Sequence, residues 1–473
     1  MEAPLSTTRR SALALSLLAV GASLVVLPPP ARPGPTGQPP DPATLAPAAQ
    51  AAPLGPGVWQ MYGHDLANSR NAGAAGPSPS AARRLGPVWS FESTTGGITG
   101  TPVVAGGRVV ALSNNGVVYA LDALTGKLQW RREIDLPRHY LNGTAAIDGG
   151  VVFVPVSAAT GAWIVALSLS DGSIRWSTLL DPQQDRADLY SSPVVWRGTI
   201  YIGESGTNTE NHLTSERIRG AMVALDEQSG RVRWRTYTVP PHRDGAPIWT
   251  SAAIDTATGR IYEGTGNAYH APAAGTTDAI LSIASGSGRI LRYASTTAHD
   301  VLKDYDFGAS PNLFRGAHGR PLVGALQKPR VYWAFDRRTL KPVWKVRTTT
   351  TPPPRPPHEG EALASTAYDG TRIYGQSDNG QLFAISRGGR RVWITSPQGG
   401  LGFGPVALAN GVVYRVVSRG FLEARLAKDG RLLERLPLGA RAWGGVSVAG
   451  GWVFVNTGTD TSPQGYVVAY RPR

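Results

Sequence analysis

Short runs rich in valine, leucine, isoleucine and tyrosine recur along most of the chain and are separated by turns that contain glycine. The clearest stretch has apolar runs at 101–105, 108–112, 117–122 and 127–133. The turns between them contain Gly106-Gly107, Asn115-Gly116 and Thr125-Gly126. Gly-Gly and Asn-Gly supply the positive φ that tight hairpins need. The pattern therefore predicts a four-stranded antiparallel meander, and no stretch of helical period competes with it.

One phrase closes this unit and recurs along the sequence. Residues 120–130 read A-L-D-A-L-T-G-K-L-Q-W, and residues 224–234 read A-L-D-E-Q-S-G-R-V-R-W. Weaker copies occupy 166–176, 334–344 and 384–393. A repeat of four strands at this period predicts a β-propeller. The closing tryptophans are predicted to pack between neighbouring blades, and they are Trp130, Trp176, Trp234, Trp344 and Trp393.

The number of blades follows from the closing positions. Arg292 and Glu434 occupy the closing slot in two further copies, which makes seven. An eighth closing phrase, L-G-P-V-W, ends at Trp89 and has no inner strands before it. The C-terminal end has the opposite defect, because runs at 446–449, 452–456 and 466–471 lack a fourth strand. We therefore predict an all-β, eight-bladed propeller whose ring is closed by an N-terminal strand around Trp89.

The N-terminal part differs in composition from the rest. Residues 1–27 place Arg9-Arg10 before an uncharged run, which predicts an export signal or an N-terminal anchor. Residues 28–57 are rich in proline and alanine and are predicted to form a linker. The propeller is assigned to residues 58–473. This organisation predicts an exported protein that is periplasmic, extracellular or tethered to the outer face of the cell membrane.

Charge and cysteine content narrow the possible functions. The formal net charge is +14, but the basic residues are scattered and are not interleaved with aromatic ones. This distribution favours a solvated surface over nucleic-acid binding, with affinity for anionic envelope polymers as a minor hypothesis. The chain has no cysteine, and therefore neither a disulfide nor a C-x-x-C-H haem attachment motif.

Candidate chemistry gathers in the long connections of the third, fourth and fifth blades. In a propeller with strands A to D, the D–A and B–C connections emerge on one face. The A–B and C–D turns emerge on the other. The polar and aromatic residues that the long connections bring to the first face are Glu204, Glu210, Glu216, Trp249, Asn267, Asp300, Asp304, Asp306 and Lys328. Residues from three adjacent blades are thus expected to lie close together on one face.

At these residues the chain resembles the pyrroloquinoline-quinone (PQQ) dehydrogenases, which are eight-bladed quinoproteins, and within them the polyvinyl-alcohol-dehydrogenase-like branch. The resemblance covers roughly residues 58–471. It rests on W-Q-M-Y-G-H-D-L-A-N-S-R at 59–70, W-T-S-A-A-I-D at 249–255 and G-T-G-N ending at Asn267. It also rests on H-D-V-L-K-D-Y-D-F-G-A-S-P at 299–311 and on Q-K-P-R around Lys328.

The resemblance implies a role for each matching residue. Trp249 would be the flat platform under the quinone, and Lys328 would donate to the quinone oxygens. Asn267 and Asp304 would be oxygen ligands of Ca²⁺, with Glu210 as the third ligand. Glu204 or Glu216 could replace Glu210, because the family's short S-x-x-E spacing is disrupted here. Asp304 would also take the alcohol proton as general base while hydride passes to PQQ.

The implied function is the oxidation of an alcohol, which could be polymeric, with electrons passed to an external acceptor. A second interpretation stays open, a non-catalytic propeller that acts as an envelope scaffold or binding module. The departures from the family pattern favour it. Asn142 stands where an arginine is expected, Pro247 where a threonine is, and Leu302-Lys303 where one tryptophan is usual. Asp300 and Asp306 are expected to lie in a solvated loop.

Overall fold

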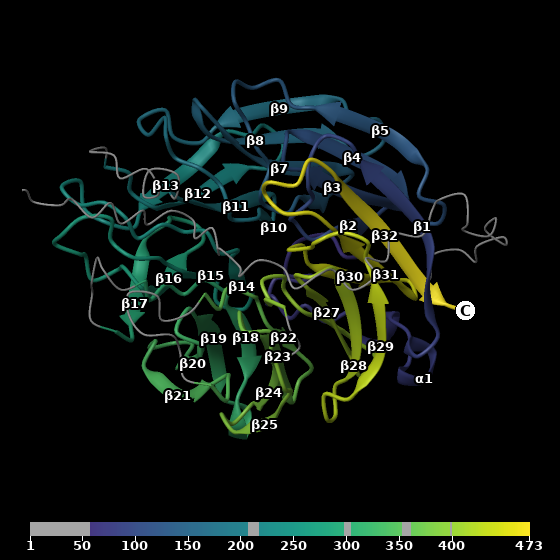
Figure 1. Ribbon diagram of the computed structural model, residues 1–473. Helices are drawn as coiled ribbons and strands as arrows, with labels where there is room; N and C mark the ends of the chain where they lie inside the picture. Colours follow the sequence, from purple (N-terminus) through teal and green to yellow (C-terminus); the bar gives the residue numbers. More distant parts are fainter. Residues whose placement is uncertain (1–56, 207–216, 298–303, 352–360, 398–399) are drawn as a thin grey trace, which may run out of the picture.

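The computed structural model describes residues 57–473 except 207–216, 298–303, 352–360 and 398–399. Its strands form eight sheets of four strands each, and every neighbouring pair of strands is antiparallel. The sheets are arranged radially around a central axis (Figure 1). The prediction of an all-β propeller with eight four-stranded blades is therefore confirmed.

The first four blades follow one another along the chain, and each runs from its innermost to its outermost strand. Blade 1 consists of β2 (Val103–Ala105), β3 (Arg108–Ser113), β4 (Val117–Asp122) and β5 (Leu128–Glu133). Blade 2 consists of β6 (Ala146–Asp148), β7 (Val151–Ala158), β8 (Gly161–Ser168) and β9 (Ile174–Leu179). Blade 3 consists of β10 (Val194–Trp196), β11 (Thr199–Glu204), β12 (Ala221–Asp226) and β13 (Val232–Tyr237). Blade 4 consists of β14 (Ala253–Asp255), β15 (Arg260–Gly264), β16 (Ala279–Ala284) and β17 (Ile290–Ser295).

The remaining blades repeat this order, except that the last one takes a strand from the N-terminal side. Blade 5 consists of β18 (Asn312–Arg315), β19 (Pro321–Gln327), β20 (Val331–Asp336) and β21 (Pro342–Arg347). Blade 6 consists of β22 (Ala367–Tyr368), β23 (Arg372–Gln376), β24 (Leu382–Ser386) and β25 (Arg391–Ile394). Blade 7 consists of β26 (Ala407–Ala409), β27 (Val412–Val417), β28 (Phe421–Leu426) and β29 (Leu432–Pro437). Blade 8 consists of β30 (Val446–Ala449), β31 (Trp452–Asn456), β32 (Gly465–Pro472) and β1 (Leu85–Ser93).

In blade 8, β1 pairs with β32 in a register that sets Trp89 opposite Ala469. Among the described residues, helical structure is limited to α1 (Pro79–Ala82) and two 3₁₀ turns, η1 (Gly73–Ala75) and η2 (Ala317–Gly319). No helix in the described part of the chain is long and apolar enough to cross a membrane. The predicted export signal lies outside the described residues, as does nearly all of the predicted linker.

The closing tryptophans join most of the blades to the next one. The indole N–H of Trp130 in blade 1 donates to the carbonyl of Leu169 in blade 2 at 2.9 Å. The ring of Trp130 covers Gly172, where a Cβ atom would come within 2.5 Å of it. Trp89 makes the equivalent contact from blade 8 to blade 1, donating to the carbonyl of Ala123 at 3.2 Å. The glycine at positions such as Gly172 is therefore required by close packing as well as by its positive φ.

An N-terminal strap, residues 59–75, runs along the inner strands of the ring and was not anticipated from the sequence. Trp59 exchanges backbone hydrogen bonds with Val104 of blade 1 at 2.8 Å. Further along, the strap accepts backbone N–H groups from blades 2, 4, 5, 6, 7 and 8, from Ile147, Ile254, Leu313, Tyr368, Leu408 and Gly451. The fully buried Arg70 donates to the carbonyls of Val406 and Val446. The strap thus ties seven blades together around the axis.

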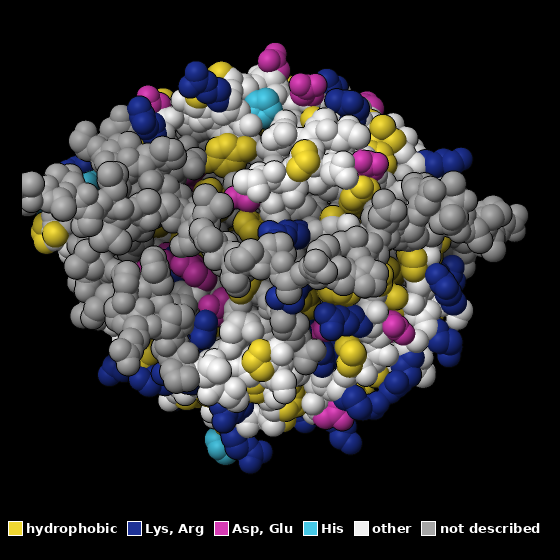
Figure 2. Space-filling model, in the orientation of Figure 1, with side chains coloured by type: hydrophobic (Ala, Val, Ile, Leu, Met, Phe, Trp, Pro, Cys, Tyr) yellow, Lys and Arg dark blue, Asp and Glu magenta, His cyan; other side chains and the backbone are white. Residues whose placement is uncertain are grey.

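Surface charge is spread over the face drawn in Figure 2. Lysine and arginine side chains lie around the perimeter and alternate there with acidic, polar and apolar ones. The outermost strand of blade 1 illustrates this, because Arg131 and Glu133 form an exposed ion pair at 3.8 Å. Charged side chains on outer strands hinder edge-to-edge pairing with other molecules.

Candidate active site

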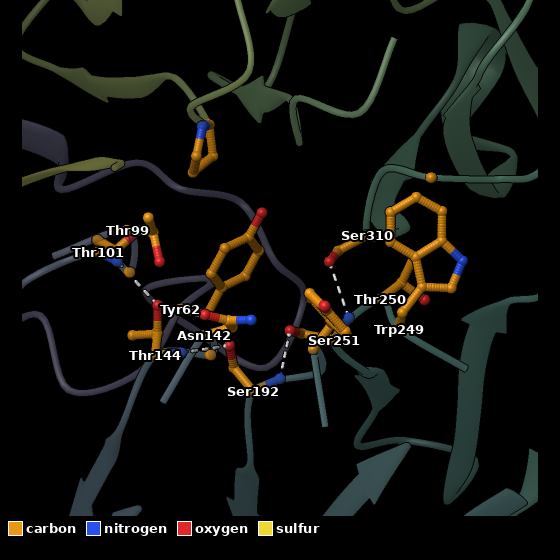
Figure 3. Close-up of a pocket in the computed structure, with 15 residues that line it drawn as sticks. Tyr62, Thr99, Thr101, Asn142, Thr144, Ser192, Trp249, Thr250, Ser251 and Ser310 are labelled. Carbon is orange, nitrogen blue, oxygen red and sulfur yellow. Dashed lines mark hydrogen bonds between the residues drawn. The ribbon is translucent and has the colours of Figure 1, made fainter. Parts of the chain in front are cut away.

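A belt of hydroxyl groups surrounds the axis where the inner strands begin. Each of these hydroxyl groups accepts a hydrogen bond from a backbone N–H of the preceding blade. The acceptors are Thr144, Ser192, Ser251, Ser310 and Ser365, at 2.8–3.1 Å. Several of these bonds are drawn in Figure 3. Because the hydroxyl oxygen accepts the backbone proton, its own proton can turn toward the axis and donate to a ligand there.

The belt encloses a cavity of about 80 Å³. Tyr62 of the strap lines this cavity (Figure 3), and its hydroxyl donates to Ser365 at 2.8 Å. Asn142 and Trp249 also line it, from the D–A connections of blades 2 and 4. Asn142, which stands where the family pattern is expected to have an arginine, thus lines this cavity. The lining of this cavity is polar and contains no charged side chain.

Trp249 is held by its neighbours on the side of blade 5. A Cβ atom on Gly308 would come within 3.2 Å of the indole ring, so the backbone at Gly308 lies directly against the ring. Lys328 approaches from the B–C connection of blade 5, with Nζ 5.0 Å from the indole centroid. An aromatic ring with an ammonium group at this distance is suited to binding a flat, electron-poor or anionic ring system.

Lys328 is buried and surrounded by carboxylates. Its Nζ atom lies 2.7 Å from Asp304, 3.1 Å from Asp306 and 3.9 Å from Glu361. Burial alone would lower the pKa of Lys328, but the charges of Asp304, Asp306 and Glu361 outweigh it and raise this pKa well above its ordinary value. Lys328 is therefore protonated at neutral pH, although its side chain is buried.

The environment of Asp306 differs from the one predicted from the sequence. We expected a solvated side chain, but Asp306 is only 3% exposed. Its carboxylate accepts the backbone N–H of Asn267 at 2.8 Å and contacts Lys328. The prediction was wrong because the spacing of three aspartates in a loop does not reveal which of them turns inward. Asp306 links the connections of blades 4 and 5 that carry Asn267 and Lys328.

The predicted metal ligands are only partly within the described residues. Asn267 is 7% exposed, and the side chain of Asp304 is 33% exposed. Glu210, Glu216 and Asp300 lie outside the described residues. Within the described ranges, no group of three or more histidine or carboxylate side chains is arranged to hold a metal ion. The amide and carboxylate oxygens of Asn267 and Asp304 are nevertheless the donor types that Ca²⁺ prefers.

Glu204, the alternative ligand within the described residues, lies at the end of β11 in blade 3. Its side chain is fully buried, and neither carboxylate oxygen has a hydrogen-bond partner. Arg235 is 3.9 Å away. Burial, reinforced by the charge of Asp181, raises the pKa of Glu204 to about 8. Glu204 therefore lies beside Arg235 and Asp181.

Sequence reasoning missed Glu361 and Tyr62. Glu361 follows a proline-rich stretch and has no motif around it. Tyr62 belongs to the W-x-x-Y-G phrase, whose position at the axis depends on the strap. Only the positions of distant segments reveal these contacts, because Tyr62 and Ser365 are 303 residues apart.

An eight-bladed ring with an indole, a buried lysine and several carboxylates near its axis defines a class of propeller with a polar site on one face. The family described as "glucose/ethanol/alcohol dehydrogenase, beta-propeller domain" (PQQ) matches residues 59–368, well over half of the chain. This chain belongs to that family.

Individual relatives are similar over part of their length. A polyvinylalcohol dehydrogenase of Pseudomonas sp. is 28% identical over 326 residues, which cover 59% of this chain and 49% of that protein. The quinohemoprotein alcohol dehydrogenase ADH-IIG of Pseudomonas putida is 25% identical over 340 residues, covering 61% of this chain and 45% of that protein. The chain therefore spans about half the length of the curated relatives it matches.

A solved structure shows the same fold. The quinohemoprotein alcohol dehydrogenase of Comamonas testosteroni superposes with a TM-score of 0.73 at 19% identity. The match covers 89% of this chain and 81% of that one. The propeller is thus shared over nearly the whole length of this chain.

Proposed function

We propose that this protein is an exported, PQQ- and Ca²⁺-dependent dehydrogenase that oxidises an alcohol, with polymeric alcohols among the candidate substrates. The observation that carries the proposal is the buried Lys328, in contact with Asp304 and 5.0 Å from the indole centroid of Trp249. These three residues come from two adjacent blades and meet on one face. Family membership and the similarity to polyvinylalcohol dehydrogenase support the reaction class.

The residues present fit a planar quinone that carries carboxylates. The indole of Trp249 would stack on the ring, and the ammonium of Lys328 would donate to the quinone oxygens. Belt hydroxyls such as Thr144 and Ser192 would donate to acceptors near the axis. When bound, PQQ supplies the two-electron acceptor for a hydride from the alcohol carbon.

The charges around Lys328 support a metal cation. Asp304, Asp306 and Glu361 carry three negative charges against the one positive charge of Lys328. This leaves an excess of two negative charges in a partly buried region, which a divalent cation would neutralise. Asn267, Asp304 and Glu210 would hold the ion, and Glu204 or Glu216 are the alternatives to Glu210. When bound, the ion would polarise the quinone carbonyl.

Asp304 is the proposed general base. Its side chain is the most exposed of the three carboxylates around Lys328, at 33%, and can therefore be reached by a substrate hydroxyl. It would accept the hydroxyl proton of the alcohol while the carbon loses hydride, which leaves a carbonyl product. The 473 residues contain no haem attachment motif, so we propose that the electrons pass to an external acceptor.

The test is reconstitution of the purified protein with PQQ and Ca²⁺. We expect bound-quinone absorbance and dye-linked oxidation of alcohols, both lost with a chelator. A panel of short primary alcohols, secondary alcohols and polyvinyl alcohol would define the substrate. Absence of quinone binding at micromolar PQQ would favour the non-catalytic propeller. The physical reason would be the missing arginine and threonine contacts at Asn142 and Pro247.

A further inference from the structure

The turn that presents Lys328 contains a residue in an unfavourable conformation. β19 ends at Gln327 and β20 begins at Val331, so a three-residue loop of Lys328, Pro329 and Arg330 joins them. Arg330 has φ of 64°, in the left-handed region. Hairpins of this length normally place glycine there, because a side chain in this region strains the backbone. An arginine at this point indicates that its side chain has a role.

The side chain of Arg330 forms a two-pronged ion pair with Asp378 of blade 6. Nε and Nη2 each lie 2.7 Å from one of the two carboxylate oxygens. Both residues are only 7% exposed. A planar guanidinium that donates two parallel hydrogen bonds fixes orientation as well as distance. The pair therefore fastens the tip of the blade 5 hairpin to blade 6.

The same ion pair also holds the segment that carries Glu361. Oδ2 of Asp378 accepts the backbone N–H of Glu361 at 3.1 Å. The next residue, Ala362, donates its N–H to the carbonyl of Lys328 at 3.3 Å. The buried Arg330–Asp378 ion pair thus holds both the backbone of Lys328 and the segment that carries Glu361, one of the carboxylates around the ammonium.

We propose that Arg330 and Asp378 are a positioning pair that holds the ammonium of Lys328 between Trp249 and Asp304. Neither residue contacts the ammonium directly, and both act through the backbone of the loop. Buried ion pairs add little net stability compared with well-packed apolar side chains, so a geometric role accounts better for this one. The consequence for quinone binding rests on the proposed function, whereas the positioning itself does not.

A double variant separates positioning from folding. Arg330→Gly suits the left-handed conformation, and Asp378→Asn avoids a lone buried carboxylate. The matched control is Arg337→Gln with Asp255→Asn. That pair also joins two adjacent blades, with 3.4 Å between Nη1 and Oδ2, but it lies among the A–B and C–D turns of the opposite face. Both double variants are first compared with the wild type by thermal unfolding.

Crystal structures of both variants without quinone test the positioning directly. We expect the ammonium of Lys328 to move beyond 4 Å from Asp304 or Asp306 in R330G/D378N and to keep both contacts in R337Q/D255N. An unmoved Lys328 in R330G/D378N would overturn the proposal. If that variant does not fold, the structure of Arg330→Lys is determined instead. Lysine keeps the charge but cannot donate two parallel hydrogen bonds to Asp378, so the same movement of Lys328 is expected.

Quinone titration gives the second readout. We expect the dissociation constant of PQQ to rise at least tenfold in R330G/D378N and less than twofold in the control. Equal effects in both variants would mean a general loss of stability and would overturn the proposal. If the wild type does not bind PQQ, the proposed function fails, and the crystal structures still decide whether the pair positions Lys328.

Discussion

Lys328 Nζ lies 2.7 Å from each of the two carboxylate oxygens of Asp304. This two-point contact keeps Asp304 beside a cation whose own pKa is held well above its ordinary value by the surrounding carboxylates. The side chain of Asp304 is still partly exposed, so a substrate can reach it. A carboxylate in this state can accept a proton from an alcohol and is also suited to bind a cation.

The first prediction concerns Asp304→Asn. The amide keeps an oxygen that can contact Lys328 or a cation, but it cannot accept a proton. We expect dye-linked alcohol oxidation to fall about 10²–10⁴-fold. The unfolding temperature should stay close to that of the wild type.

The control for this variant is Asp171→Asn, because Asp171 bonds only within an exposed turn. It should oxidise alcohols at the wild-type rate. Quinone titration of both variants separates loss of the base from loss of the cofactor. A normal rate in Asp304→Asn would move the general base to another residue, with Asp306 as the first to test.

The second prediction concerns Trp249. Trp249→Ala removes the platform, so we expect PQQ affinity to fall about tenfold or more, since aromatic stacking contributes roughly 0.5–1.5 kcal/mol beyond the buried area. Trp249→Phe should retain most of the affinity. The control is Trp163→Phe, because Trp163 bonds only to Thr160 in an exposed hairpin. Quinone absorbance in a titration measures all three, and an unchanged affinity in Trp249→Ala would exclude the stacking role.

The sequence predicted the propeller well because each blade is a local unit. Turn glycines and closing tryptophans lie within one repeat, and β3, β4 and β5 fall within one residue of the predicted runs. The site was only partly predictable. The sequence drew attention to Trp249, Asp304 and Lys328, and in the structure Lys328 contacts both of the others, while their functional roles stay predictions. The wrong environment for Asp306 and the omission of Glu361 share one cause, because both depend on contacts between blades.

The position of the strap was even harder to predict from the sequence. Its backbone hydrogen bonds reach blades that begin tens to hundreds of residues later in the chain. A segment with little regular structure of its own carries no periodic pattern, so its place at the axis cannot be inferred from spacing.

Arg330, in contrast, could be noticed in the sequence. An arginine where a hairpin favours glycine is a local irregularity that the sequence displays, but its partner Asp378 is visible only in the fold.

The third prediction concerns the pH dependence of stability. Burial raises the pKa of Glu204 from an ordinary 4.5 to about 8. Between these values the folded protein keeps the proton and the unfolded chain loses it, so stability falls as pH rises. The loss from this group is at most about 5 kcal/mol. Glu204→Gln should therefore match the wild type near pH 4.5 and exceed it at pH 8.5.

Denaturant unfolding at both pH values measures this difference in stability, with the exposed Glu133→Gln as control.

Glu204→Gln also tests which glutamate completes the proposed calcium site. If Glu204 completed the calcium site, Ca²⁺ would raise the unfolding temperature of the wild type but not of Glu204→Gln. An equal calcium effect in both proteins leaves Glu210 or Glu216 as the ligand. Equal stability of both proteins at pH 8.5 would contradict the shifted pKa.

The last prediction concerns the N-terminal segments of the ring. Removing residues 58–93 deletes both the strap and β1, so β32 loses its outer partner and blade 1 loses the contact from Trp89. Unpaired edge strands aggregate, and we expect this chain to lose cooperative unfolding. A chain that begins at residue 77 keeps β1 and loses the strap with its buried Arg70. It should fold with a lower unfolding temperature. A chain that begins at residue 58 is the control and should unfold cooperatively. If the chain without residues 58–93 unfolds like this control, neither β1 nor the strap is needed to close the ring.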